Sequence, residues 1–155
     1  MKSDEPPTGP DPEVITKAIL ERYPETVVGN AMGATFFSLD EKQWPNFATI
    51  VTTDEHDEGA PSYLARPGVF RLNIGVTKAT YQRLVGSAAA PDDAAFDRLL
   101  PHPVYARQHW IAILNPSEAS MRDVVWPLIE EAHDRLAAVS ERHHRPPSRP
   151  SSRPR

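Results

Sequence analysis

The sequence has no cysteine and only seven glycines among its 155 residues. Without cysteine the chain forms no disulfide, thiolate metal site or thiol nucleophile. The sequence also lacks the Gly-x-Ser-x-Gly elbow of serine hydrolases, the glycine-rich phosphate-binding loops and the His-Glu-x-x-His pair of zinc proteases. We therefore expect no bound metal and no cofactor, and we find no sign of serine-hydrolase or nucleotide-hydrolase chemistry.

Long apolar runs are also missing. The longest covers residues 110–114, whereas a membrane-spanning helix needs about 20 apolar residues. The N-terminus carries Asp4 and Glu5 where a secretory signal would have a cationic end followed by an apolar run. These features predict a cytoplasmic protein without a membrane partner.

Charge is distributed unevenly along the chain. Residues 142–155 contain five arginines and no acid, so the preceding part holds 12 basic and 21 acidic residues, a net charge of −9. An acidic body repels phosphate backbones. Nucleic acid is therefore a possible partner only through the tail from Arg142 to Arg155.

Composition divides the chain into three parts. Residues 1–10 and 142–155 are polar and rich in proline or arginine, with no apolar period, and are predicted to be disordered. Residues 11–141 contain enough apolar sequence for one domain with an ordinary core.

Four helices are predicted, at residues 12–23, 77–84, 92–100 and 116–142. Asp11 and Thr77 are N-cap residues for the first two. The residues from Asn115 to Glu118 are typical of a capping box that begins the last helix. Its apolar stripe continues through Pro127, which predicts one kinked helix.

Five strands are predicted, at residues 26–28, 34–39, 47–53, 69–74 and 110–114. In the fourth strand, Phe70, Leu72 and Ile74 should face the core, leaving Arg71 and Asn73 on the opposite face. The sequence predicts an α+β domain with two layers: an antiparallel sheet of four to five strands packed by the N- and C-terminal helices.

Several segments resemble an uncharacterised bacterial family, the domain-of-unknown-function family 6194: Phe47-Ala-Thr-Ile-Val-Thr, Arg66-Pro-Gly-Val-Phe-Arg-Leu-Asn-Ile-Gly-Val, His102-Pro-Val-Tyr and Trp110 through Asn115-Pro-Ser-Glu. The likeness spans about residues 12–136 and implies no residue role, because the family has no established activity. More distantly, the order of elements is similar to that of the MmcQ/YjbR-like proteins. That resemblance implies a two-layer α+β fold related to CyaY, and DNA binding.

The best candidate ligand site consists of Arg71, Asn73, His102, Tyr105 and Glu118. If the fourth and fifth strands are neighbours, an outward Arg71 beside Asn73 offers forked donors to a carboxylate or phosphate. The structural alternative is that Arg71 pairs with a surface acid, that His102 and Tyr105 satisfy loop carbonyls, and that Glu118 only closes the capping box.

Two further groups of residues are interpreted as structural. The cluster Asp54-Glu55-His56-Asp57-Glu58 has cation-binding side chains but not the spacing of an EF-hand, and we interpret it as part of a solvated loop covering residues 54–67. Trp44 and Trp126 are interpreted as packing residues.

Three classes of function follow from these observations. A binding module for a small molecule or peptide is favoured, because no positioned nucleophile, base or metal site is evident. The alternatives are a weak nucleic-acid binder that uses the basic tail and a sheet face, and an enzyme whose catalytic residues the sequence does not identify.

Overall fold

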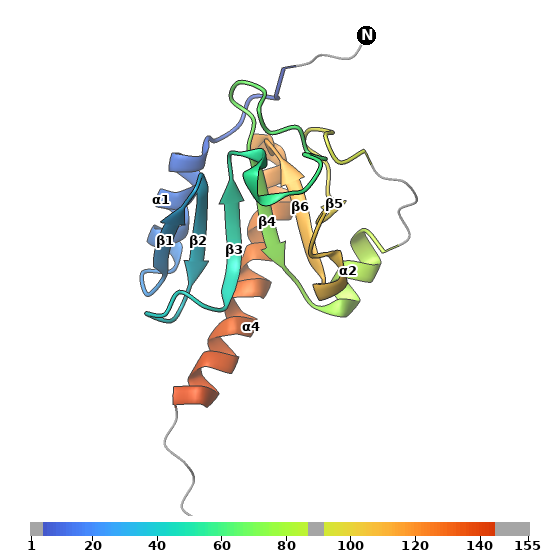
Figure 1. Cartoon of the computed structure of the whole chain (residues 1–155). Helices are drawn as coiled ribbons and strands as arrows, with labels where there is room; N and C mark the ends of the chain where they lie inside the picture. The colour runs from blue at the N-terminus through green and yellow to red at the C-terminus, as the bar shows by residue number, and fades with distance from the viewer. Residues whose placement is uncertain (1–4, 87–91, 145–155) are drawn as a thin grey trace, which may run out of the picture.

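The computed structural model describes residues 5–86 and 92–144. Six strands form one sheet in the order β1-β2-β3-β4-β6-β5, and every neighbouring pair is antiparallel (Figure 1). The strands are β1 Val27–Ala31, β2 Ala34–Ser38, β3 Asn46–Val51, β4 Arg71–Gly75, β5 Leu100–Pro101 and β6 Trp110–Leu114. The predicted α+β class is confirmed, and the strand beyond the five predicted is the two-residue β5.

The α-helices are α1 Pro12–Arg22, α2 Lys78–Leu84, α3 Glu118–Ser120 and α4 Trp126–His144. The first two begin where their capping residues predict. A carboxylate oxygen of Asp11 accepts the N–H of Val14 at 2.9 Å, and Thr77 Oγ1 accepts the N–H of Thr80 at 3.1 Å. Each cap satisfies a backbone donor that has no partner within the helix.

A π-helical segment, Met121–Val125, joins α3 to α4, so the chain stays helical through Pro127 as predicted. Trp126 N–H donates to the Met121 carbonyl, five residues earlier. A proline has no N–H to donate and its ring crowds the carbonyl four residues before it. The wider turn immediately before Pro127 makes room for that ring, as π-bulges do elsewhere.

The predicted start of this last helix was wrong. Ser117 is the N-cap, and its Oγ accepts the N–H of Ser120 at 3.1 Å. Asn115 has a φ of 43° and binds the chain before β4 instead: its Oδ1 accepts Phe70 N–H at 3.1 Å and its Nδ2 donates to the Gly68 carbonyl at 2.9 Å. A local capping pattern does not reveal this long-range role.

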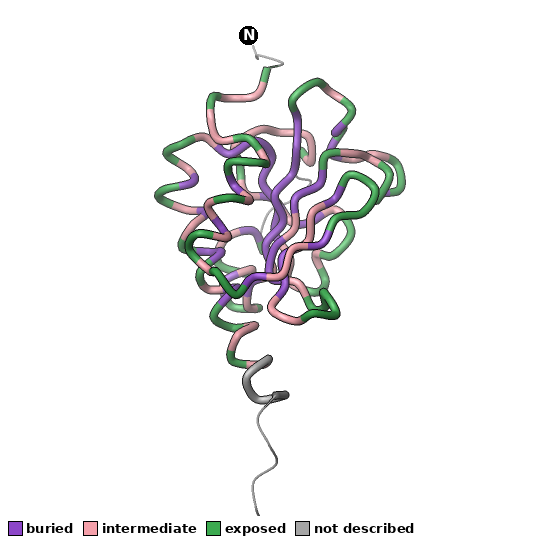
Figure 2. The backbone as a smooth tube through the Cα atoms, turned by 90° about the vertical axis from the view of Figure 1, so that its left-hand side faces the viewer, coloured by how far each residue is buried: buried purple, intermediate pink, exposed green. Residues whose placement is uncertain are grey.

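Helices cover one face of the sheet, with α1 behind β1 and β2 and α4 behind β3 and β4 (Figure 1). Buried side chains of the strands meet buried side chains of α1 and α4 in the larger apolar cluster, among them Ile19, Ile50, Leu72, Ile111 and Ile129. Figure 2 shows the strands mostly buried and the turns at their ends mostly exposed. We call this the helix face.

The opposite face, which we call the open face, carries a second and smaller apolar cluster. Its buried members are Ala34, Val51, Leu64, Val69, Leu100 and Leu114. The loop of residues 52–67, which we call the covering loop, contributes Leu64. This face is therefore partly covered by the loop, which contains a short 3-10 helix at Asp54–His56, and not by any of the four α-helices of the described residues.

The helix predicted at residues 92–100 is wrong. Residues 92–99 form turns and an isolated bridge between Phe96 and Leu114, and Leu100 begins β5. Leu99 packs against the helix-face cluster while Leu100 belongs to the open-face cluster. Extended backbone sends consecutive side chains to opposite faces of the sheet. The apolar residues Phe96, Leu99 and Leu100 therefore pack on two faces here, although their spacing also suits one face of a helix.

The predicted ends of the domain fall partly outside the described residues. Residues 1–4 of the expected disordered N-terminus and residues 145–155 of the expected tail lie outside them. Gly9 is placed close to the chain before α3, since a Cβ on it would lie 2.2 Å from the Pro116 carbonyl oxygen. In the described part of the chain, no helix has the length and apolar character needed to cross a membrane.

Candidate ligand pocket on the open face

A pocket of about 650 Å³ lies on the open face and continues past the end of the sheet where β3 begins. Its walls come from strands β2, β3, β4 and β6, from the covering loop and from α4. The segments before β3 and between β5 and β6 complete them. It is lined by Ala34, Phe36, Trp44, Pro45, Asn46, Phe47, Thr49, Val51, His56, Asp57, Arg71, Asn73, Gly75, His102, Tyr105, Gln108, Trp110, Ala132, Arg135, Leu136 and Val139.

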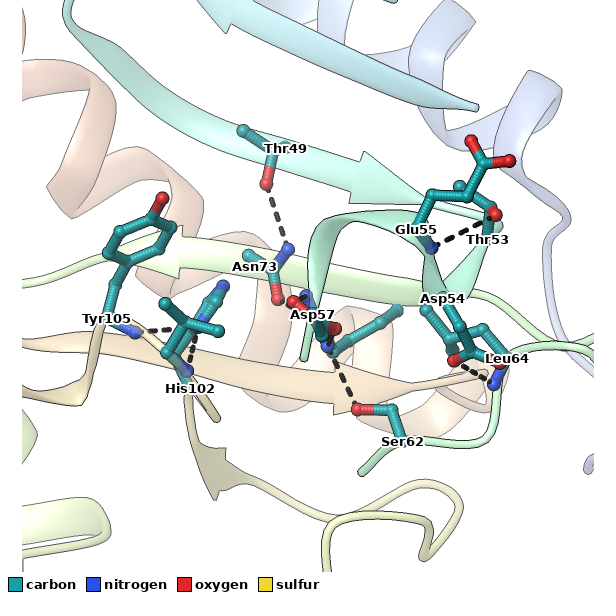
Figure 3. A network of polar contacts seen from close by, with 12 residues as sticks. Thr49, Thr53, Asp54, Glu55, Asp57, Ser62, Leu64, Asn73, His102 and Tyr105 are labelled. Atoms are coloured by element: carbon teal, nitrogen blue, oxygen red, sulfur yellow. Dashed lines mark hydrogen bonds and ion pairs between the residues drawn. The ribbon is translucent and has the colours of Figure 1, made fainter. Parts of the chain in front are cut away.

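Arg71 lines this pocket and is the centre of a polar network, whose members Asp57, Ser62, Asn73 and Thr49 are labelled in Figure 3. Its Nη1 and Nη2 donate to the two carboxylate oxygens of Asp57, and Nη1 also donates to Ser62 Oγ at 2.9 Å. Its Nε donates to Asn73 Oδ1 at 2.8 Å. The guanidinium fork therefore already holds a carboxylate in the paired geometry that it favours.

This network corrects two expectations. Arg71 lies on the face opposite the helices, but it is only 1% exposed and does not point outward. Asp57 is also buried, so the interpretation of its acidic cluster as a solvated loop is wrong at that position. The carboxylate that the Arg71 fork was expected to take from a ligand comes from the chain itself.

The covering loop is held over the sheet by its own hydrogen bonds as well as by Asp57. The two carboxylate oxygens of Asp54 accept Leu64 N–H at 2.8 Å and Ala65 N–H at 3.2 Å. His56 Nε2 contacts the Met32 carbonyl oxygen at 2.9 Å, which ties the loop to the β1–β2 turn. These bonds hold the loop in a defined position above Arg71.

Asn73 connects the network to β3. Its Nδ2 donates to Thr49 Oγ1 at 2.9 Å, while its Oδ1 accepts from Arg71. Thr49 and Asn73 are directly opposite in the β3–β4 register, so the bond crosses the sheet between paired residues. The Thr49 hydroxyl hydrogen has no acceptor among the described residues, and Thr49 lines the pocket.

His102 is held as a neutral hydrogen-bond donor. Its Nδ1 accepts the N–H groups of Val104 and Tyr105, both at 3.0 Å, so the ring proton resides on Nε2. Burial lowers the pKa of His102 to about 3, helped by the positive charge of Arg71 and opposed by Asp57. The ring accepts from loop amides, whereas the structural alternative had it satisfying loop carbonyls.

Aromatic side chains form the rim. Trp44 is 72% exposed and Tyr105 is 53% exposed, and both line the pocket. The Trp110 ring lies against Gly75, where an added Cβ would come within 2.9 Å of it. The interpretation of Trp44 as a packing residue is therefore wrong, while Trp126 does pack against the helix-face cluster.

The structure brings together four of the five predicted site residues. Arg71, Asn73, His102 and Tyr105 all line the pocket, because β4 pairs with β6 and β6 pairs with β5, which leads into the His102 segment. Glu118 does not join them and lies at the start of α3, in a separate groove with Trp126. Ligand binding by these residues stays a prediction.

Sequence reasoning missed several lining residues, notably Asp57, Thr49, Trp44 and Arg135. One signal was available: a charged residue alternating with apolar ones on a strand whose neighbours are also apolar needs a buried partner. The position of that partner in a distant loop was not visible in the sequence.

Residues 5–86 and 92–144 contain no cluster suited to a metal ion. No group of three or more histidine, aspartate or glutamate side chains there could hold one. The neutral, doubly engaged ring of His102 is also unsuited to act as a general base near pH 7.

Comparison with known proteins gives a family and no activity. The family of unknown function DUF6194 matches residues 10–145. No curated protein and no solved structure shows a significant match to the chain. The match covers most of the sequence, and the chain belongs to the DUF6194 family.

Proposed function

We propose that this protein binds a small organic molecule in the open-face pocket. The observation that carries the proposal is the meeting of a hydrogen-bonded polar floor and an aromatic rim in one cavity of about 650 Å³. Pockets for small ligands typically measure about 300–1,000 Å³ and combine a mainly apolar lining with a few placed polar groups.

The rim supports the proposal. Trp44 and Tyr105 expose large rings to solvent on segments that precede β3 and follow β5, at two sides of the pocket. Such rings provide a broad contact area and lose little conformational entropy when they are covered. A ligand covering both rings would remove apolar surface from water.

The floor supports the proposal in a different way. Arg71, Asp57, Asn73 and Thr49 hold one another through consecutive hydrogen bonds, so their positions are set before any ligand arrives. A prearranged site avoids the entropy of ordering side chains on binding. Two lining residues, Thr49 and His102, keep a donor without an acceptor among the described residues, and these donors would then orient the ligand.

A thermal-shift screen of small organic metabolites on the full-length chain tests this proposal. A ligand that binds only the native state raises Tm by mass action. Each stabilising compound is then tested on Tyr105→Ala and on Tyr63→Ala. Tyr63 is a matched control because it is similarly exposed, at 57%, and lies outside the pocket lining.

The expected result is that stabilising compounds shift wild type and Tyr63→Ala equally and lose most of the shift in Tyr105→Ala. Equal shifts in both variants would place binding elsewhere and overturn the proposal. A broad library that contains no stabilising compound would overturn it as well.

A further inference from the structure

We infer that the ligand is an organic anion with a flat ring, whose carboxylate faces Arg135 on α4 while the ring lies between the pocket aromatics. This inference rests on the proposed binding function and adds the charge and shape of the ligand. It follows from the charges and hydrogen-bond donors that line the cavity.

The permanent charges in the lining nearly cancel. Arg71 and Asp57 neutralise each other in a buried pair, and Asp57 is the only acidic residue among the described residues that line the pocket. His102 is neutral. The remaining permanent charge is the guanidinium of Arg135, so the pocket carries about one positive charge within a body whose net charge is −9.

Arg135 has no ion-pair partner among the described residues, although acids lie near it on the same helix. Glu131, one turn before, accepts hydrogen bonds from Thr77 N–H at 3.2 Å and Thr80 Oγ1 at 2.9 Å. Asp134 pairs with His133 Nδ1 at 3.0 Å. Both nearby carboxylates are engaged elsewhere, which leaves Arg135 available at the cavity.

The position of Arg135 favours a charge at the mouth of the pocket. Arg135 is exposed and also lines the pocket, so its guanidinium is accessible both to solvent and to a ligand. A carboxylate there keeps part of its hydration while it gains the fork of an arginine. An anion buried at Arg71 would instead have to displace the Asp57 carboxylate, and it would lose its hydration without gaining a free guanidinium.

The rest of the lining fixes the other features of the ligand. The planar rings of Trp44, Tyr105 and Trp110 favour a flat ring by stacking or edge contact. The unused donors of Thr49 and His102 favour an acceptor atom on the part of the ring away from the carboxylate.

The lining also offers hydrogen-bond acceptors. Gln108 is exposed, and Asn46 Oδ1 is buried without a hydrogen-bond partner among the described residues, although Asn46 lines the pocket. A cationic ligand would meet Arg135 with the same sign of charge. The lining therefore discriminates between ligands by their charge more than by their number of donors.

Isothermal titration calorimetry with 2-naphthoate and 2-naphthamide on the full-length chain tests the inference, because the two probes share a ring and differ in charge. We expect 2-naphthoate to bind about fivefold more tightly than 2-naphthamide, equivalent to one modest charged contact. Arg135→Gln should abolish this ratio. The ratio should also fall as salt is raised, because an exposed ion pair is screened.

The matched control is Arg83→Gln, which removes an exposed helical arginine outside the pocket lining and should leave the ratio unchanged. Equal affinity of wild type for the two probes, or a ratio that survives Arg135→Gln, would overturn the inference while leaving the pocket itself intact. Failure of wild type to bind 2-naphthoate would overturn the inference, whereas the proposed function fails only if the thermal-shift library also contains no stabilising compound.

Discussion

The two faces of the sheet bury the same strand, β4, in opposite ways. On the helix face, Leu72 and Ile74 pack among other apolar side chains. On the open face, Arg71 and Asn73 are just as buried, but they are surrounded by hydrogen-bond partners from β3 and the covering loop. The helix face is a conventional core, and the open face is a polar structure enclosed by loops.

This difference teaches that burial has different consequences on the two faces. Apolar packing is non-directional, so a side chain of similar volume replaces another with a small loss. A buried polar network depends on every partner, because a single unpaired charge in it is strongly unfavourable. We expect the open face to tolerate substitution less, and its shape to be more sharply defined.

The largest expected effect is on the buried ion pair. Arg71→Met leaves the Asp57 carboxylate buried without its partner and should lower the free energy of unfolding by about 3–5 kcal/mol. The double substitution Arg71→Met, Asp57→Leu removes both charges and should recover most of that loss. Urea denaturation of the three proteins measures it, and a double variant no more stable than the single one would contradict this view of the open face.

A comparison of conservative substitutions on β4 sharpens the contrast. Leu72→Met keeps the volume on the helix face and should cost less than about 1.5 kcal/mol. Arg71→Lys keeps the charge but loses the paired donors to Asp57 and the Nε contact with Asn73. We expect Arg71→Lys to be the more destabilising of the two in the same urea titration, and the reverse order would show that the faces do not differ as described.

The pH dependence of stability should reveal His102. The unfolded chain protonates this residue near its ordinary pKa of 6.5, whereas the folded protein holds its pKa near 3. Its contribution to stability is therefore fully present above pH 6.5 and is lost as the pH falls toward 3, by up to about 1.4 kcal/mol per pH unit. His102→Asn retains an acceptor without this titration and should show a shallower slope in denaturation between pH 6.5 and 4.5; identical slopes would contradict the assignment.

The smallest expected effect is at the edge of the network. Thr49→Val removes the acceptor of Asn73 Nδ2 and should cost about 1 kcal/mol. The matched control is Thr35→Val on the β1–β2 hairpin, where the hydroxyl bonds an exposed Asn30 at 3.0 Å and its loss should stay within about 0.5 kcal/mol. Thermal denaturation that ranks the two variants in the opposite order would weaken the account of the open face.

Local signals in the sequence predicted much of the fold. Asp11 and Thr77 began their helices as expected, and five strands appeared in the predicted order. Alternation along β4 correctly separated Leu72 from Arg71. These features depend on residues close together in the chain, where side-chain periodicity and capping chemistry act directly.

The errors involve contacts between distant segments. Asp57 lies 14 positions from Arg71 and crosses onto it from a loop, and Asn115 reaches Phe70 from 45 positions away. Each of these polar residues also fits a local role, in a solvated loop or a capping box. Its actual partner, the Arg71 guanidinium or the Phe70 N–H, comes near it only in the folded sheet. Glu118 was included in the candidate site as a titratable neighbour of Arg71 and Asn73, but it lies at the start of α3 in a separate groove with Trp126.

The most direct test of the account is the behaviour of the three tryptophan indole N–H signals in a ¹H–¹⁵N NMR titration with a stabilising compound. Trp44 and Trp110 line the open-face pocket, whereas Trp126 lies in the groove beside α3. The account predicts that the signals of Trp44 and Trp110 move with ligand concentration while that of Trp126 stays in place. Movement of the Trp126 signal alone, or no movement of the other two, would contradict it.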